Sequence, residues 1–267
     1  MIEQRNNVLW FKINGVSRYL LAHFLSKVFP LFIINEYPKS GGSWIGEMLS
    51  DALDIPFPRN RLPLLKSSIL HGHMMDDWNI KNALIVWRDG RDIIVSQYFH
   101  SLFENERGNS RLVKQTRADL CFSDYLAVER NLPSFIEYVY EVKRYPKFTW
   151  VDFVKKWSKN HSCVFVRYED IHKDPAKELI NITYQLANCS LDREIAEQIV
   201  NRHSFENLSG RRPGDEDTRS FMRKGIVGDW KNYFSPESRV KFNSYASEAL
   251  SILGYEENEN WVNSHEK

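Results

Sequence analysis

The stretch LFIINEYPKSGGSW, residues 31–44, joins a short apolar run to a turn rich in proline and glycine. The apolar run, Leu31–Glu36, is continuous rather than alternating, which is typical of a strand buried on both faces. The two glycines allow a tight turn, and the residues after them predict a helix from Ser43 to about Leu53. This order of strand, glycine turn and helix is the unit from which parallel sheets are built.

Three more apolar runs have the same character and predict strands at Ser68–His71, Ala83–Trp87 and Cys163–Arg167. Strands that alternate with helices indicate right-handed crossovers and a parallel sheet covered by helices. We therefore expect an α/β fold with a central parallel sheet flanked by helices. Ligands of such sheets bind at the carboxyl ends of the strands, so the chemistry is expected just after the last residue of each strand.

Amphipathic or capped segments predict further helices at Val16–Phe29, Asp92–Phe103, Asp152–Lys159, Ala176–Ala187, Leu191–Asn201 and from Pro236 onward. Ser235 is expected to cap the last of these, because a serine followed by proline is a common helix start. The polar segment Glu206–Met222 has no periodicity and predicts a long loop of the size that is often functional. No repeat or low-complexity segment is visible, and a single domain over residues 1–267 is expected.

The composition is that of a folded protein without a strong charge bias. The chain has 267 residues, of which 42% are hydrophobic and 27% charged, so it is too apolar for a disordered chain. Lys and Arg number 36 against 35 Asp and Glu, which gives a formal net charge of +1. A nucleic-acid-binding protein would show a broad basic excess. No nucleic-acid partner is therefore expected, whereas a small anion held by local charge is compatible with this balance.

The cysteines and the N-terminal residues favour a cytoplasmic protein. Cys121, Cys163 and Cys189 form neither a CxxC pair nor a disulfide framework. The opening MIEQRNNVLWF lacks the basic and apolar regions of a signal peptide. The most apolar segment, Tyr19–Ile34, is too short and too interrupted to span a bilayer. An amphipathic helix there could still contact a membrane surface, with ordinary core packing as the alternative.

The segment YPKSGGSW, which follows the first strand, contains the parts of an oxyanion cradle. Gly41 and Gly42 let successive backbone N–H groups point at one spot, and the next helix adds roughly half a positive charge at its N-terminus. Lys39 adds a full charge, and Ser40 and Ser43 add hydroxyl donors. The spacing differs from the GxxxxGK[ST] loop of ATPases. The alternative is an ordinary turn between a strand and a helix.

Two further segments carry groups suited to phosphate oxygens. In VWRDGRDIIVSQYF, Arg88 ends a strand and presents a planar fork, and Ser96 on the following helix could donate to the same group. In RKGIVGDWKNYF, Arg223 and Lys224 precede Gly225, which predicts a second anion site of backbone and charge. Surface ion pairs and a solvated basic turn are the alternatives.

Two histidines end the second predicted strand. His71 and His73 are separated by Gly72, and the period of two in a strand places both side chains on the same side of the sheet edge. A metal site with two histidines is conceivable from this pattern. No third ligand of suitable spacing is evident in the sequence, so no metal is expected.

Three segments in the same order resemble the cytosolic-type sulfotransferases. YPKSGGSW is similar to their YPKSGTTW segment, WRDGRDIIVSQYF to their RNxxDxxVSxYxF segment, and RKGIVGDWKN matches their RKGxxGDWKN segment almost letter for letter. The resemblance extends from about Phe32 to Phe234. It implies the P-loop-NTPase-like sulfotransferase fold, 3′-phosphoadenosine 5′-phosphosulfate (PAPS) as sulfuryl donor, and adenosine 3′,5′-bisphosphate (PAP) as the nucleotide product.

The resemblance also implies roles for the residues at matching positions. The 5′-phosphosulfate would be held by Lys39, Ser40, Gly41, Gly42 and Ser43. The 3′-phosphate would be held by Arg88, Ser96, Arg223, Lys224 and Gly225. The adenine would contact Trp44, Tyr168 in FVRYED and Phe205 in HSFENL. The segment Glu206–Met222 would be the flap over the donor.

The family's catalytic histidine closes a strand that reads KTH. Here the strand ends His71-Gly72-His73, so His73 is expected to be the general base, and Lys39 is expected to stabilise charge on the leaving oxygen. His71 replaces the family's lysine, which removes part of the usual 5′-phosphate contact. The gap from His73 to Arg88 is shorter than usual in the family, which leaves His71 as the alternative base.

The expected activity is in-line transfer of a sulfuryl group to an acceptor hydroxyl, without a metal. Carbohydrate, lipid-linked and phenolic acceptors are all compatible with the aromatic-rich segment Glu104–Lys147, which could equally be a packed helical lid. The rival functions are a nucleotide kinase on a related fold, whose ATPase loop is missing, and a non-catalytic nucleotide-binding module. The family's dimer segment, KxxxTVxxxE, is not matched after Lys231, so no oligomeric state is predicted.

Overall fold

The computed structural model describes residues 8–25, 28, 30–59, 61–78 and 80–263. They form two compact units. The first runs to Arg88 and resumes over Asn160–Pro213, and the second contains Asp89–Lys159 and the chain from Gly214 onward. The single domain expected over the whole chain stays a prediction.

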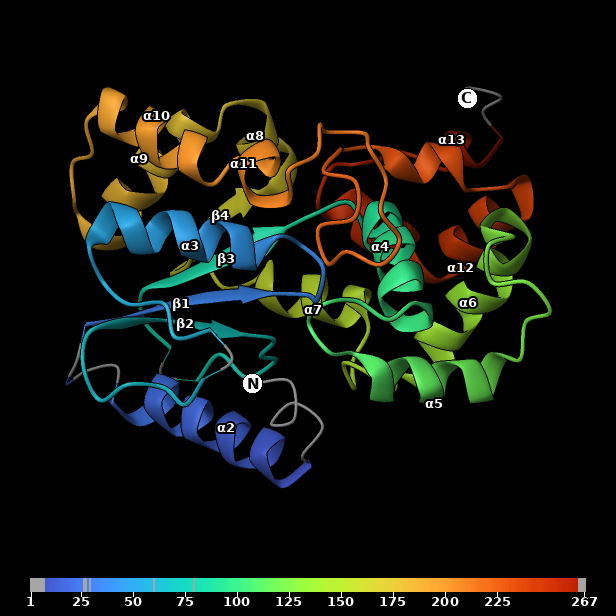
Figure 1. Cartoon of the computed structure of the whole chain (residues 1–267), viewed down its shortest axis with the longest axis horizontal. Coiled ribbons are helices and arrows are strands. Elements are labelled where there is room, and N and C mark those ends of the chain that lie inside the picture. Colours follow the sequence, from blue (N-terminus) through green and yellow to red (C-terminus); the bar gives the residue numbers. More distant parts are fainter. Residues whose placement is uncertain (1–7, 26–27, 29, 60, 79, 264–267) are drawn as a thin grey trace. The chain divides into compact units, whose positions relative to one another are not determined.

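The first unit contains a parallel sheet, as the apolar runs predicted (Figure 1). Its four strands are β1 Leu31–Glu36, β2 Ser68–Gly72, β3 Ala83–Trp87 and β4 Val164–Arg167. They lie in the order β2-β1-β3-β4, and every pair is parallel. The expected strands are therefore confirmed, with β2 extending one residue further and β4 beginning one residue later.

Helices flank this sheet and supply its core (Figure 1). The helices of the first unit are α2 Val8–Leu20, the π-helical turn η1 Leu21–Leu25, α3 Gly42–Leu53, α8 Tyr168–Lys173, α9 Pro175–Ala187, α10 Arg193–Arg202 and α11 Phe205–Ser209. Side chains of the sheet such as Ile34 and Leu84 pack with Ile45 of α3 and Leu179 of α9 in one almost fully buried apolar cluster. Burial of this kind is the main stabilising contribution to a fold.

The N-terminal helix begins earlier than expected. α2 starts at Val8 rather than Val16. The helix continues through Gly15, since a single glycine destabilises a helix by only about 1 kcal/mol. The predicted end of this helix at Phe29 lies outside the described residues. Val16 is 59% exposed, and contact of this helix with a membrane surface stays a prediction. Among the described helices, none combines the length and the apolar character needed to cross a membrane.

The prediction of a loop over Glu206–Met222 is wrong for its first residues. The short helix α11 occupies Phe205–Ser209, and the Ser204 hydroxyl caps it by accepting the N–H of Asn207. A helix of five residues is too short to show a periodic pattern, so the sequence could not reveal it. Beyond Gly210 the segment has no regular structure up to Met222, as predicted.

The second unit is helical. Its elements are α4 Gly90–Leu102, α5 Ser110–Leu120, α6 Val128–Val142, α7 Trp150–Trp157, η2 Asp229–Asn232, α12 Pro236–Ile252 and α13 Asn260–Asn263. Ser235 caps α12 as expected, by accepting the N–H of Ser238. In the aromatic-rich segment, Phe135 and Tyr140 are 0% and 5% exposed, so packing within the unit accounts for both rings.

Within the second unit, Asp92 joins α4 to the RKGIVGDWKN segment. The Asp92 side chain is buried, and its two oxygens accept the N–H of Gly228 at 2.7 Å and of Trp230 at 2.9 Å. Both donors lie far along the chain from α4. A carboxylate with two backbone donors therefore holds the second and third motifs of the sequence together.

Replacing Asp92 by alanine is expected to lower the free energy of unfolding by about 2–4 kcal/mol, because two backbone N–H groups lose their charged acceptor. Chemical denaturation monitored by circular dichroism measures the change. Asp217→Ala is the matched control, since the Asp217 carboxylate accepts the N–H of Arg219 at an exposed site. Equal effects of the two substitutions would contradict the role given to Asp92.

Candidate functional site

The turn between β1 and α3 has the backbone form expected of an anion cradle. Lys39 and Gly41 have left-handed φ angles of 78° and 97°, and α3 begins directly afterwards at Gly42. The Gly42 N–H donates to Oε2 of Glu36, a carboxylate that the chain itself supplies. The Ser40 hydroxyl donates to the carbonyl of Tyr37 at 2.8 Å, so it braces the turn. The N-terminus of α3 therefore donates a backbone N–H to a carboxylate, the kind of group that helix N-termini favour.

Tyr168 and Arg88 pack against this cradle from the ends of two other strands. A Cβ atom at Gly41 would lie only 2.5 Å from Cδ2 of Tyr168. The Arg88 guanidinium lies 4.3 Å from the centre of the Tyr168 ring and donates to the carbonyl of Lys39 at 2.8 Å. The segments after the carboxyl ends of β1, β3 and β4 thus bring four predicted site residues together, as expected for a parallel sheet.

The two remaining aromatic residues of the predicted adenine site lie in the same unit. Trp44, in the first turn of α3, has its ring 6.0 Å from that of Tyr168 in an edge-on arrangement. Its indole N–H donates to the carbonyl of His203 at 2.8 Å, so it ties α3 to the end of α10. Phe205 follows two residues later, and its ring lies 5.2 Å from the guanidinium of Arg211. The structure therefore pairs Trp44 with Tyr168, whereas stacking of Phe205 on adenine stays a prediction.

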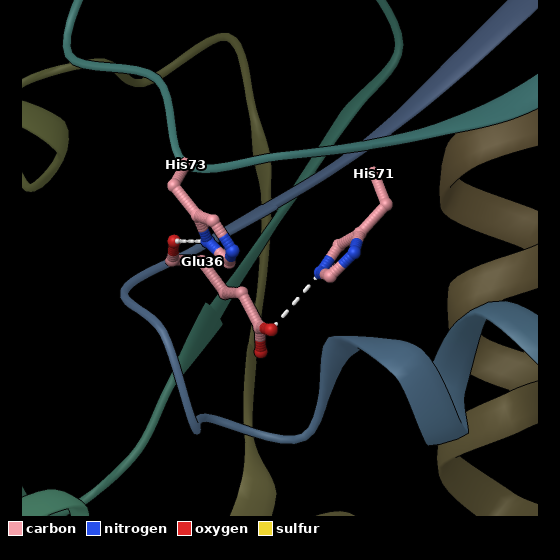
Figure 2. A group of neighbouring side chains, drawn as sticks. All are labelled: Glu36, His71 and His73. Carbon is pink, nitrogen blue, oxygen red and sulfur yellow. Dashed lines mark hydrogen bonds and ion pairs between the residues drawn. The ribbon is translucent and has the colours of Figure 1, made fainter. Parts of the chain in front are cut away.

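Glu36, His71 and His73 form a cluster at the ends of β1 and β2 (Figure 2). The parallel register pairs Ile34 with His71. Because side chains alternate along a strand, Glu36 and His73, each two residues further on, lie on the same face as that pair. His71 Nε2 is 2.9 Å from Oε1 of Glu36, and the two imidazole centres are 5.1 Å apart.

The hydrogen bond of His73 fixes which ring nitrogen carries the proton. His73 Nδ1 lies 2.9 Å from the backbone carbonyl of Glu36. A carbonyl oxygen only accepts, so Nδ1 carries the proton and the lone pair of the neutral ring is on Nε2. Burial, together with the nearby His71, lowers the pKa of His73 to about 4. His73 is therefore neutral at pH 7, with Nε2 able to accept a proton.

The Glu36 side chain is a buried carboxylate that remains charged. Burial by itself would raise the pKa of Glu36, but the hydrogen bond and charge of His71 outweigh it and hold that pKa below its ordinary value. The motifs in the sequence did not single out this residue. The feature of the sequence that could have identified Glu36 is an acidic residue at the last position of a buried strand, directly before the cradle.

The other predicted site residues belong to the second unit. The Arg223 guanidinium lies 4.3 Å from the ring of Phe99, one turn along α4 from Ser96. Arg223 forms ion pairs with Glu216 and Asp229, and Lys224 pairs with Asp229 at 2.7 Å. The predicted flap thus contributes a carboxylate to the Arg223 site. The structure thus places Arg223 against α4, which carries Ser96, and Lys224 beside Asp229. Gly225 follows Lys224 in a left-handed conformation, with φ 66°.

Replacing Gly41 by alanine is expected to destabilise the first unit by at least about 2 kcal/mol, because a left-handed φ costs an L-residue about 1–2 kcal/mol and the Tyr168 clash adds to it. Gly210→Ala is the matched control, since Gly210 has φ 70° but a Cβ atom there would meet no described atom within 4 Å. Denaturation curves measure both. Tyr168→Ala should recover part of the loss only in the Gly41 variant, and no recovery would contradict the clash.

Replacing Asp229 by asparagine is expected to lower the free energy of unfolding by about 3–5 kcal/mol at pH 7, because Arg223 and Lys224 lose a buried counter-charge. Burial alone would raise the pKa of Asp229, but its hydrogen bond with Lys224 and the charge of Arg223 hold it below the ordinary value. The carboxylate therefore stabilises the fold fully above the unfolded pKa of about 4, and this contribution is lost progressively as the pH falls from there through the lower pKa of the folded state.

The difference in free energy of unfolding between the wild type and the Asp229→Asn variant should therefore shrink as the pH is lowered from about 5 to about 3. Urea denaturation at each pH measures it. Glu197→Gln is the control, because Glu197 forms an exposed i,i+4 pair with Arg193. Such pairs contribute about 0.3–0.5 kcal/mol. A pH-independent difference for Asp229→Asn would contradict the assignment of a charged Asp229.

Comparison with known proteins finds relatives of this chain. A family model described as a sulfotransferase domain matches residues 78–254, well over half of the chain. Sulfotransferase 1B1 of Mus musculus is 27% identical over 266 residues, with 82% of each chain covered. Sulfotransferase 1E1 of Rattus norvegicus is 26% identical over 260 residues, covering 80% of this chain and 81% of the relative.

Solved structures show the same fold at lower identity. The mouse sulfotransferase SULT7A1 complexed with PAP has a TM-score of 0.62 and 20% identity, covering 87% of this chain and 86% of that one. A retinol dehydratase in complex with androsterone and the inactive cofactor PAP has a TM-score of 0.57 and 16% identity, covering 88% and 85%. With the family model matching most of the chain, the protein belongs to the sulfotransferase family.

Proposed function

We propose that this protein transfers a sulfuryl group from PAPS to the hydroxyl of an acceptor. The observation that carries the proposal is the placement of a neutral imidazole, His73, beside a cradle whose Gly42 N–H donates to a carboxylate. The carboxylate of Glu36 on the Gly42 N–H acts as a stand-in for an anionic ligand. The residues at the strand ends therefore fit a nucleotide with a phosphosulfate group. When bound, such a donor supplies a sulfuryl group on a phosphate leaving group.

The proposed nucleotide contacts follow the matched motifs. The 5′-phosphosulfate would be held by Lys39, Ser40, Gly41, Gly42 and Ser43. The adenine would contact Trp44, Tyr168 and Phe205, and the 3′-phosphate would bind Arg88, Ser96, Arg223, Lys224 and Gly225. Support comes from the packing of Arg88 and Tyr168 on the cradle and from the contact of Arg223 with Phe99, on the same helix as Ser96.

In the proposed mechanism His73 is the general base. Its Nε2 accepts the proton of the acceptor hydroxyl as the oxygen attacks sulfur, while the Nδ1–H bond to the Glu36 carbonyl keeps the ring oriented. Lys39 stabilises the negative charge that develops on the departing phosphate oxygen. By analogy with phosphoryl transfer, the transition state is loose, so positioning and preorganised charge supply most of the rate.

The Glu36 carboxylate affects this mechanism, because it accepts the N–H of Gly42, one of the groups proposed to hold the donor. Its other oxygen, Oε1, lies 2.9 Å from Nε2 of His71, and the lysine that the family has in place of His71 is absent. The proposal therefore assigns the main electrostatic role to Lys39 and the backbone of the cradle rather than to His71.

Nucleotide binding is tested by thermal unfolding with PAP, with ATP as the comparison. PAP at 100 times its dissociation constant should stabilise the protein by about 2.7 kcal/mol. Lys39→Ala and Arg88→Ala should each reduce that stabilisation. Stabilisation by ATP without any response to PAP would instead favour a nucleotide kinase.

Replacing His73 by asparagine is expected to lower sulfuryl transfer by about 10²–10⁴-fold while PAP still stabilises the protein. Transfer from labelled PAPS to a panel of phenols, sugars and lipid alcohols measures the rate. His161→Asn, at an exposed site, is the control and should transfer normally. Full turnover by the His73 variant, with loss in His71→Asn, would move the base to His71. Normal PAP binding with no transfer to any acceptor by the wild type would favour a non-catalytic module.

A further inference from the structure

We propose that Glu36, His71 and His73 form a binding site for a divalent transition-metal ion of the Zn²⁺ type. One potential ligand atom from each residue lies within 4.8 Å of the other two. Figure 2 shows the carboxylate and both imidazoles gathered at the same strand ends. The sequence offered only the two histidines, and the fold supplies the missing third ligand from the neighbouring strand.

The spacing of the ligand atoms is close to that of a tetrahedral site. Zinc–nitrogen and zinc–oxygen bonds of about 2.0–2.2 Å place neighbouring ligand atoms about 3.3 Å apart. His71 Nε2 and Glu36 Oε1 are already 2.9 Å apart. The widest pair in the cluster would have to contract by at most ~1.5 Å relative to such a site. That is within the range of side-chain rotation.

The hydrogen-bond partners of His73 and Glu36 are of the kind that orients metal ligands in proteins. His73 donates its Nδ1–H to the Glu36 carbonyl, which directs the Nε2 lone pair away from the backbone. The second oxygen of Glu36 accepts the Gly42 N–H, which leaves Oε1 on the side of His71. Histidine ligands typically use their other nitrogen in this way, and ligating carboxylates are typically hydrogen-bonded.

The backbone that carries the ligands is also fixed. The buried Asn35 amide bonds Met74 in both directions, donating to its carbonyl at 3.0 Å and accepting its N–H at 2.7 Å. The Arg18 guanidinium of α2 donates to the carbonyl of His71 at 2.8 Å. These contacts flank His71 on β2 and His73 just beyond its end, so the two histidines are held near Glu36 before any ion binds.

The donor set selects the kind of ion. Two imidazole nitrogens and one carboxylate oxygen suit Zn²⁺, Co²⁺ or Fe²⁺, whereas Mg²⁺ and Ca²⁺ prefer oxygen ligands alone. Three protein ligands leave at least one position for water or another small ligand. The site shares His73 with the proposed base, but its existence does not depend on sulfuryl transfer. A bound ion would take the Nε2 lone pair, so Zn²⁺ should inhibit transfer and a chelator should restore it.

The test is Co²⁺ and Zn²⁺ binding to the full chain after treatment with a chelator, without nucleotide. Co²⁺ absorption reports the geometry and ligand type, and calorimetry with Zn²⁺ reports affinity and stoichiometry. We expect one ion per chain with the spectrum of nitrogen and oxygen ligands. Glu36→Gln and His71→Ala should each weaken metal binding by at least roughly 10–100-fold, the loss seen when a residue that only hydrogen-bonds to a metal ligand is removed. His161→Ala, at an exposed histidine, should bind like the wild type.

Several outcomes would overturn the site. These are no binding at micromolar-scale affinity, a thiolate-to-cobalt band that places the ion on a cysteine, or unchanged binding in both Glu36→Gln and His71→Ala. Circular dichroism checks that each variant is folded, and either variant alone is sufficient if the other does not fold. PAP-induced stabilisation is measured separately, so loss of the metal site and failure of the proposed transferase activity give different results.

Discussion

The parallel register between β1 and β2 is the constraint on which the candidate site depends. It aligns Ile34 with His71, and the alternation of side chains then places Glu36 and His73 on one face at the ends of the two strands. A shift of one residue would send the histidines to the opposite face and separate them from the carboxylate. The cradle at Gly42 follows directly from the same strand, so the register also brings the imidazoles to the N-terminus of α3.

The local parts of this arrangement could be predicted from the sequence. Continuous apolar runs indicated the four strands to within one residue. Strands buried on both faces, such as β3, leave a plain hydrophobic signal, whereas β4 is only partly buried although its run is equally apolar. The glycine turn after Glu36 and the Ser235 cap were equally visible, since each depends on a few adjacent residues. The short helix α11 was not visible, because Ser204 and five residues after it carry no periodicity.

The pairing of distant segments could not be predicted in this way. Glu36 and His71 are 35 positions apart, and their contact depends on strand order and register, which apolar runs do not encode. The same holds for Asp92, whose bonds to Gly228 and Trp230 join segments more than 130 residues apart. The motif residues themselves were recognisable, but the carboxylates that the fold places against them were not.

The contact between Gly41 and Tyr168 has a consequence for how this sequence can vary. The ring leaves no room for a β-carbon at position 41, while the same ring stacks on Arg88. A larger residue in the turn would therefore require a smaller one at position 168, and that exchange would take away the aromatic support of the arginine. Substitutions at positions 41, 88 and 168 are therefore expected to occur together. A related chain that has glycine, arginine and tyrosine at these three positions is expected to keep the same loop geometry.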